Sequence, residues 1–179
     1  MPTINTVYIA TSLDGYIADR NDGIAWLESI VIPADIDLGY ADLMHRVDAM
    51  IMGRNTFETV CGLGVEWPYT CPVFVLSNTL ITLPSQYEGK AKIIKGPLQE
   101  ICTNLEKQGY KRLYIDGGAT IQSFLREDLV DELIITTFPI LLGGGPKLFG
   151  DLPKELTLKL ESSKVFLGAL VQSHYSRPF

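Results

Sequence analysis

The stretch "YIDGGATIQSFL", Tyr114–Leu125, predicts a strand that turns directly into a helix. Its apolar run ends in Asp116, then Gly117 and Gly118 follow, and apolar residues recur beyond them at helical spacing. A glycine pair at such a junction often serves only to make the turn. The free N–H groups and the positive dipole end of a helix start can also bind a phosphate. The stretch alone is compatible with both roles.

A second junction of the same kind occurs at "IMGRNT", Ile51–Thr56, where a glycine again separates a strand from a helix. Two helix starts at one rim of a sheet could hold the two ends of a dinucleotide. Arg54 lies where the helix dipole disfavours a cation, which suggests bidentate binding of a phosphate. The alternative is a surface arginine paired with a carboxylate.

Other polar residues near predicted strand ends have two possible roles each. Thr56 can cap its helix or bind a phosphate oxygen, and Ser77 and Asn78, directly after "VFVL", can bind a ligand or form a turn. The "GGGPK" segment at 143–147 lacks the spacing of a phosphate-binding loop, so we interpret it as a structural loop.

Predicted strands and helices alternate through most of the sequence. The strand "INTVYIAT" comes first, a helix is expected from Asp35 onward, and "LTLKLESSKVFLGALVQSHY" predicts an antiparallel hairpin at the end. This order predicts one α/β domain over residues 1–179. Its sheet should be mixed but mostly parallel, with helices on both faces. Ligands of such sheets bind beyond the carboxyl ends of the strands.

Composition excludes several classes of function. The chain has 179 residues, a net charge of -6 and no basic patch, which argues against binding to nucleic acid or to anionic membranes. The N-terminus does not have the pattern of a signal peptide, and no apolar stretch approaches the ~20 residues of a membrane helix. We therefore expect a cytoplasmic protein.

Cysteine and histidine spacing gives no sign of a metal site. The three cysteines, Cys61, Cys71 and Cys102, form no CxxC pair and fit a reducing compartment. His45 and His174 are far apart and have no Cys or His partner at ligand spacing. We expect no bound metal.

Five motifs together resemble the dihydrofolate reductase-like superfamily. They are "SLDGYIA", "IMGRNTFE", "VFVLSN", "YIDGGATIQSFL" and "VDELIITTFPILLGGGPKLF", in this order over nearly the whole chain. The closest branch is the C-terminal reductase domain of the bifunctional deaminase–reductase of riboflavin synthesis. The resemblance implies a central sheet of about eight strands and an NADPH cofactor.

The resemblance also implies roles for individual residues. The first glycine motif would contact the adenosine-side phosphates, Arg54 would select the 2′-phosphate, and Ser77 would support that end. The second glycine motif would carry the pyrophosphate, and two backbone positions would meet the nicotinamide amide. The residues concerned are Gly53, Arg54, Asn55 and Thr56 in the first motif, Gly117, Gly118, Ala119 and Thr120 in the second, and Ala10 and Ile17 for the amide.

The proton source implied by the resemblance is a carboxylate on the first helix, and Asp37 matches this position. In a mainly apolar pocket its pKa would be raised, which would suit proton transfer. Alternatively, Asp37 merely starts the helix, and Asp35 or Glu28 are competitors for the role. Thr136 matches a family position near the substrate.

The resemblance implies an NADPH-dependent reductase of a pyrimidine or pterin, of the 5-amino-6-(5-phosphoribosylamino)uracil reductase type. The "TV..D.P.L..R" stretch of riboflavin-pathway reductases is missing from "NTFETVCGLGVEWPYTCP", and "GRNTFE" looks more like a dihydrofolate reductase. A dihydrofolate reductase is therefore an alternative, and a non-catalytic, NADP-binding dimeric module is another. Relatives of this branch also imply a homodimer, for which the terminal hairpin offers an edge.

Overall fold

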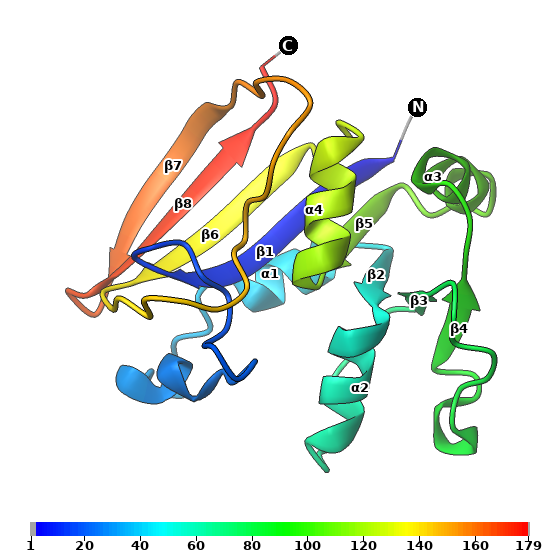
Figure 1. The fold of residues 1–179 in the computed structure, drawn as a ribbon, viewed down its shortest axis with the longest axis horizontal. Coiled ribbons are helices and arrows are strands. Elements are labelled where there is room, and N and C mark those ends of the chain that lie inside the picture. Colours follow the sequence, from blue (N-terminus) through cyan, green and yellow to red (C-terminus); the bar gives the residue numbers. More distant parts are fainter. Residues whose placement is uncertain (1–2, 179) are drawn as a thin grey trace.

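All eight strands form one twisted sheet in the order β4-β3-β2-β5-β1-β6-β8-β7 (Figure 1). The structure is a computed structural model that describes residues 3–178. Neighbouring strands run parallel from β4 to β6, and β8 runs antiparallel to both β6 and β7. The strands are β1 (Ile4–Ser12), β2 (Ala49–Gly53), β3 (Val73–Leu76), β4 (Ala91–Ile94), β5 (Arg112–Asp116), β6 (Glu132–Phe138), β7 (Lys159–Phe166) and β8 (Leu170–Ser176).

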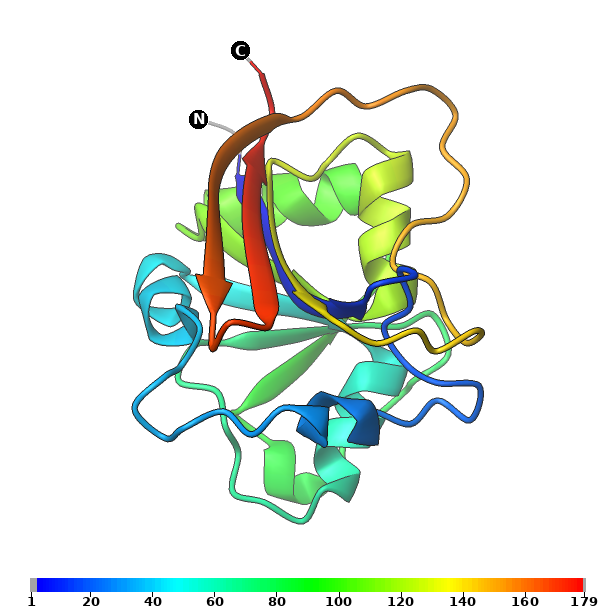
Figure 2. The same cartoon turned by 90° about the vertical axis from the view of Figure 1, so that its left-hand side faces the viewer.

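Helices cover both faces of the sheet. Side chains of α3 and α4 pack into one cluster, and side chains of α1 and α2 pack into another on the opposite face, so we call these the α4 face and the α1 face. Figure 2 shows α1 and α4 on opposite sides of the sheet. The helices are α1 (Tyr40–Arg46), α2 (Arg54–Gly62), α3 (Leu98–Lys107) and α4 (Gly118–Arg126), with short 3-10 turns η1 (Ala25–Ser29) and η2 (Ser85–Tyr87). Over residues 3–178, no helix combines the length and apolar character needed to cross a bilayer.

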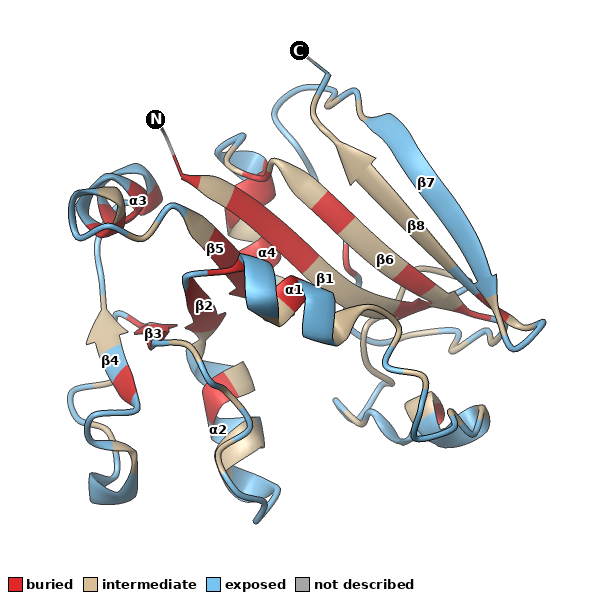
Figure 3. Cartoon of the chain, turned by 180° about the vertical axis from the view of Figure 1, so that it is seen from behind, coloured by how far each residue is buried: buried red, intermediate tan, exposed pale blue. Residues whose placement is uncertain are grey.

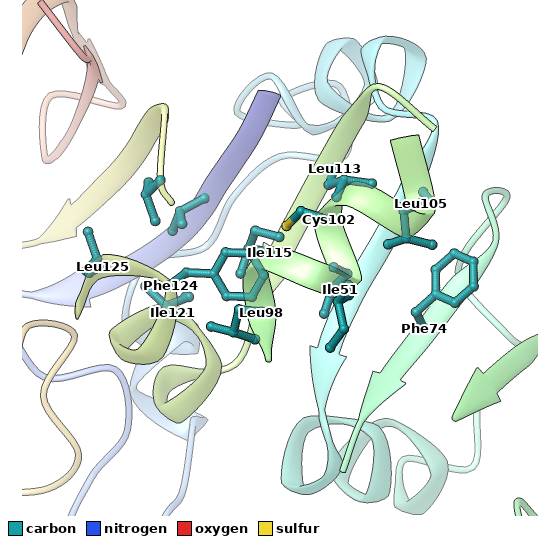
Figure 4. Close-up of a cluster of buried hydrophobic side chains, with 14 of the residues drawn as sticks. Ile51, Phe74, Leu98, Cys102, Leu105, Leu113, Ile115, Ile121, Phe124 and Leu125 are labelled. Atoms are coloured by element: carbon teal, nitrogen blue, oxygen red, sulfur yellow. The ribbon is translucent and has the colours of Figure 1, made fainter. Parts of the chain in front are cut away.

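Strand β5 shows how sequence alternation selects the two faces. Leu113 and Ile115 are fully buried on the α4 face, where they meet Phe124 of α4 (Figure 4). Tyr114 lies between them in sequence and packs on the α1 face. Burying a side chain the size of Leu or Phe contributes about 1.5–3 kcal/mol, so a slip of one residue in this strand would be strongly disfavoured.

The C-terminal hairpin is confirmed. Leu167 and Gly168 both have positive φ values, 55° and 63°, as a tight turn between twisted strands requires. The outer strand β7 is exposed along almost its whole length (Figure 3). Its free edge is therefore available to solvent or to another chain.

The helix expected from Asp35 onward begins only at Tyr40. Leu38 and Gly39 have positive φ values, 55° and 83°, which no right-handed helix can contain. Residues before Tyr40 form turns instead, because these two positions reverse the backbone. The prediction of a longer helix was therefore wrong at its start.

The two halves of the sheet separate towards the carboxyl ends of β1 and β5. The ladder between these strands runs from Ile4–Arg112 to Val7–Ile115 and ends there. Beyond Val7, β1 pairs only with β6. The remaining part of β1 therefore faces no strand on its other side, next to the Gly117 junction.

Candidate active site

The two glycine junctions predicted from the sequence are in contact. Gly53 ends β2 and Gly117 follows β5, and β2 and β5 are neighbours. A Cβ atom at Gly53 would lie 2.7 Å from Oγ1 of Thr120, and one at Gly117 would lie 2.5 Å from Oγ1 of Thr56. Each threonine thus lies over the glycine of the other junction, which only a residue without Cβ permits. The two helix starts form one continuous surface.

The first turns of α2 and α4 expose backbone donors. Within the described chain, neither helix has a side-chain cap, and neither has Asp or Glu in its first turn. Asn55 and Ala119 are exposed at these positions. The unpaired N–H groups and the helix dipoles therefore produce positive potential at this edge. The N–H of Gly117 is already used, because it donates to Oδ1 of Asp116 at 2.9 Å.

Arg54 stands beside the turn that follows β3. Its Nη1 donates to Oγ1 of Thr79 at 3.0 Å, and its Nε lies 3.6 Å from Oε1 of Glu58. Oγ of Ser77 accepts the N–H groups of Thr79 and Leu80 at 3.2 and 2.9 Å. The structural alternative considered for each residue is therefore present: Ser77 makes a turn, and Arg54 pairs with a carboxylate. The pair is exposed and therefore weak, which leaves the guanidinium available for another anion.

Ala10 and Thr136 lie side by side at the separated end of β1, and Ile17 lies over the start of α4. Ala10 pairs with Thr136 across the β1–β6 ladder, and the side chain of Ile17 covers Gly118. The N–H of Ile17 donates to the carbonyl of Pro146 at 2.9 Å. The carbonyl of Ile17 is therefore the group left for the predicted contact with a nicotinamide amide.

The "GGGPK" loop has a structural role, as expected. The carboxylate of Asp14 accepts N–H groups of Leu142 and Gly143 at 3.1 and 2.8 Å. Gly145 has a φ of 126°, and a Cβ there would overlap the carbonyl of Ala18. This loop holds the segment that contains Ile17 in place over α4.

Asp37 does not lie in an apolar pocket, so the expectation of a raised pKa is wrong. Asp37 is exposed, and its carboxylate accepts the N–H groups of Ala41 at 2.8 Å and Gly39 at 2.9 Å. These hydrogen bonds, that from Ala41 first, lower its pKa below the usual value. Asp37 thus binds the first turn of α1, which was the alternative considered. Asp35 and Glu28 are exposed as well.

Gln172 connects the predicted substrate residues and was missed from the sequence. Its Nε2 donates to the carbonyl of Leu38 at 2.8 Å and to Oγ1 of Thr136 at 3.0 Å. The hydroxyl of Tyr8 donates to the same Leu38 carbonyl at 3.1 Å. These contacts depend on the register that pairs Thr136 with Gln172, and alternation within the hairpin predicts only that some polar residue faces the sheet.

Asp116 is the second residue that the sequence did not single out as catalytic. It ends β5 on the α1 face, opposite to α4, and is partly exposed. Burial raises its pKa to about 6, although the N–H of Gly117 partly opposes this shift. Burial raises the pKa values of Tyr40, Tyr69 and Tyr114, and the charge of Asp116 raises them further. Its position at the end of a buried strand, before the glycines, was the available signal.

The cysteines form no disulfide, and burial acts on two of the three thiols. All three cysteines are free, and burial raises the pKa values of Cys71 and Cys102. Across residues 3–178, no group of three or more His, Cys, Asp and Glu side chains is placed to hold a metal ion.

Comparison with known families assigns the chain. Residues 3–171 match the family described as RibD C-terminal domain. The chain belongs to this family. The Bacillus subtilis (strain 168) protein YwjB is 38% identical over 176 residues, which cover 96% of each protein. YyaP from the same organism is 26% identical over 181 residues, covering 93% of this chain and 91% of YyaP.

Solved structures agree with this assignment. A putative riboflavin biosynthesis protein from Shewanella sp. PV-4 is 50% identical, with a TM-score of 0.96 over the full length of both chains. The deaminase/reductase of Thermotoga maritima has a TM-score of 0.74 at 16% identity, and 99% of this chain covers 57% of that protein. Dihydrofolate reductase of Enterococcus faecalis, solved with NADP(H), has a TM-score of 0.71 at 15% identity and full coverage of both chains. The last two show a common fold, which confirms the dihydrofolate reductase-like architecture.

Proposed function

We propose that this protein is an NADPH-dependent reductase of a pyrimidine or pterin heterocycle, acting in the cytoplasm. The observation that carries the proposal is the meeting of two uncapped helix starts beside Arg54, at the edge where β1 and β5 separate. Membership of a family of riboflavin-pathway reductase domains supports the same reaction class.

The residues of this edge fit the chemistry of an anionic dinucleotide. The close approach at Gly53 and Gly117 brings the N–H groups of two helices to one surface, where a pyrophosphate would gain hydrogen bonds from both. Arg54, with Ser77 and Thr79 beside it, would hold the 2′-phosphate. Gly118, Ala119 and Thr120 would bind the pyrophosphate, and Ala10 and Ile17 the nicotinamide end. When bound, NADPH would supply the hydride.

Asp116 is the side chain we propose as the holder of the proton for the substrate. With a pKa of about 6, its carboxyl is partly protonated near neutral pH, as a general acid requires. Asp37, the candidate from the sequence, has a lowered pKa and uses both oxygens to bind backbone N–H groups. Thr136 would orient the heterocycle, and its hydroxyl is fixed by Gln172.

The cofactor part of the proposal is tested by the preference for NADPH over NADH. Removing a hydrogen bond to a charged group in Arg54→Ala should weaken NADPH roughly 10- to 150-fold and leave NADH almost unchanged. Arg46→Ala is the matched control, because Arg46 ends α1 and pairs with Glu132 at the start of β6, away from this edge. Binding constants from fluorescence titration would decide, and equal weakening of both cofactors would show that Arg54 does not read the 2′-phosphate.

The substrate is tested by hydride-transfer assays with NADPH and each candidate acceptor. Turnover of 5-amino-6-(5-phosphoribosylamino)uracil would indicate the riboflavin-pathway reaction, and turnover of dihydrofolate would indicate the alternative. Tight NADPH binding with no turnover of any heterocycle would favour the other alternative, a non-catalytic NADP-binding module.

We also propose that the protein is a homodimer that uses the free edge of β7. This strand exposes Leu160 and Val165, and an edge of eight residues can extend a sheet into a second copy. A charged substitution, Val165→Lys, should shift the mass measured by light scattering from dimer to monomer. A wild-type protein that is monomeric at high concentration would refute this.

A further inference from the structure

Tyr40, Tyr69 and Tyr114 lie near enough to Asp116 on the α1 face for its charge to act on them, and Tyr8 contacts Tyr40 and Tyr114. We call these five residues the tyrosine cluster. The rings of Tyr8 and Tyr40 lie 5.8 Å apart, and the hydroxyl of Tyr114 donates to the carbonyl of Tyr8 at 3.1 Å. Tyr69 joins them from the segment between α2 and β3. Tyr8, Tyr40, Tyr69 and Asp116 are each partly exposed, so a ligand at the carboxyl end of β5 would meet them.

The charges that act on this cluster are all acidic. Burial is the main cause of the raised pKa values of all four tyrosines, and it brings that of Tyr8 to about 12. The charge of Asp116 raises the pKa values of Tyr40, Tyr69 and Tyr114 further, and that of Asp37 adds to the shift of Tyr8. No lysine or arginine of the described chain contributes to the pKa shift of any of the five residues. Cations lie elsewhere on this face, since Arg46 pairs with Glu132 and Arg54 stands at the start of α2.

The segment that supplies Tyr69 contributes aromatic side chains to this face, whereas a phosphate site would need cationic ones. Trp67 packs edge-on against Tyr69 at 5.1 Å and against Phe57 of α2 at 6.2 Å. This packing fixes the position of Tyr69 against the cluster. Phosphate binding in proteins relies on arginine, lysine or clustered N–H groups, and partly buried carboxylates repel an anion.

We propose that the substrate of this reductase is an unphosphorylated nitrogen heterocycle, neutral or positively charged, whose N–H groups donate to Asp116 and to the phenols of the tyrosine cluster. This inference rests on the proposed function, because it names the substrate class of the same site. The edge then has two electrostatic ends, an electropositive one for the cofactor phosphates at Arg54 and an acidic one for the heterocycle. The flat rings of Tyr40 and Tyr69 provide apolar contact for a planar ligand.

The test is a charge series of single-ring pyrimidines of similar size. Affinities of 2,4-diaminopyrimidine, uracil and orotate are measured by calorimetry, with and without saturating NADP⁺, and NADPH affinity is measured separately. We expect the diaminopyrimidine to bind best and orotate to bind at least roughly tenfold more weakly, as the loss of a hydrogen bond to a charged group implies. Uridine should likewise bind better than uridine 5′-monophosphate.

Two variants connect this preference to the named residues. Asp116→Asn keeps an acceptor for the N–H of Gly117 but removes the charge, so it should abolish the preference over orotate. Tyr69→Phe should weaken all three pyrimidines without changing their order, and Asp151→Asn, in an exposed loop, is the control. Unchanged NADPH affinity would show that each variant is folded.

Two results would overturn the inference. The first is that orotate binds as tightly as 2,4-diaminopyrimidine, or uridine 5′-monophosphate as tightly as uridine. The second is that no pyrimidine binds at millimolar concentration. Failure of NADPH to bind, with the pyrimidine order intact, would instead refute the proposed function alone.

Discussion

Gly117→Ala tests whether the contact between the two helix starts stabilises the fold. Gly117 has a φ of 93°, and an added Cβ would lie 2.5 Å from Oγ1 of Thr56 and 3.5 Å from the backbone nitrogen of Gly53. The substitution therefore adds backbone strain and a steric overlap at the same point. Neither can be relieved by moving Gly117 alone, because Gly53 lies on the neighbouring strand.

The two effects have separate magnitudes. A left-handed backbone costs an L-residue about 1–2 kcal/mol, and overpacking adds about 1–3 kcal/mol. We expect Gly117→Ala to lower the free energy of unfolding by about 2–5 kcal/mol in total. For a chain of this size, the melting temperature should fall by roughly 4–20 °C.

Urea denaturation of three variants separates strain from overlap. Gly109 has a similar φ of 98° but open space around its Cβ position, so Gly109→Ala should lose only about 1–2 kcal/mol. Combining Gly117→Ala with Thr56→Ala should recover about 0.5–3 kcal/mol relative to the sum of the single changes. Equal losses for Gly117→Ala and Gly109→Ala, with additive behaviour of the double variant, would refute the contact.

Three further predictions concern carboxylates. The folded-state pKa of Asp116, about 6, exceeds its ordinary 3.8, so its ionisation should reduce stability as pH rises from about 4 to 7, by up to about 3 kcal/mol. In Asp116→Asn, the midpoint of urea unfolding should no longer fall between about pH 4 and 7, and the protein should be more stable at pH 7. A midpoint that depends on pH as in the wild type would contradict the raised pKa. The pKa of Asp37 is lowered, so its contribution to the free energy of unfolding is present at neutral pH and lost as pH falls below about 4. Asp37→Asn should therefore lose stability at pH 7 and little at pH 3. The reverse order would be inconsistent with capping of α1 by Asp37. Asp14→Ala should accelerate hydrogen exchange at Leu142 and Gly143, and unchanged rates would mean that other contacts hold the loop.

Local patterns in the sequence were sufficient for most of the fold. The apolar run of β2 and the glycine that ends it predict a buried parallel strand followed by a helix, and β2 is buried except at Gly53. The start of α1 was mispredicted because the apolar periodicity begins at Ile36, whereas the backbone of Leu38, which follows it, is left-handed. Periodicity reports which side chains can share a face, and it does not report φ.

The candidate site was only partly predictable for a different reason. Glycine junctions are local patterns, and both were found. The environment of Asp116 is not local, since Tyr40 and Tyr69 reach it from segments far away in sequence. The exposed position of Asp37 and the link from Gln172 to Thr136 likewise depend on tertiary packing that spacing alone does not specify.

The short ladder between β1 and β5 has a mechanical consequence. Residues proposed to hold the phosphates, such as Arg54 and Gly118, belong to the half of the sheet formed by β2 to β5, while Ala10 and Thr136 belong to the half formed by β1, β6, β8 and β7. Between β1 and β5, strand pairing joins these halves only from Ile4–Arg112 to Val7–Ile115. Rotation about this seam changes the spacing between the two sets of residues while every other strand pairing is kept. A ligand that contacts both halves would hold them at a fixed distance, so its length would determine the angle between them.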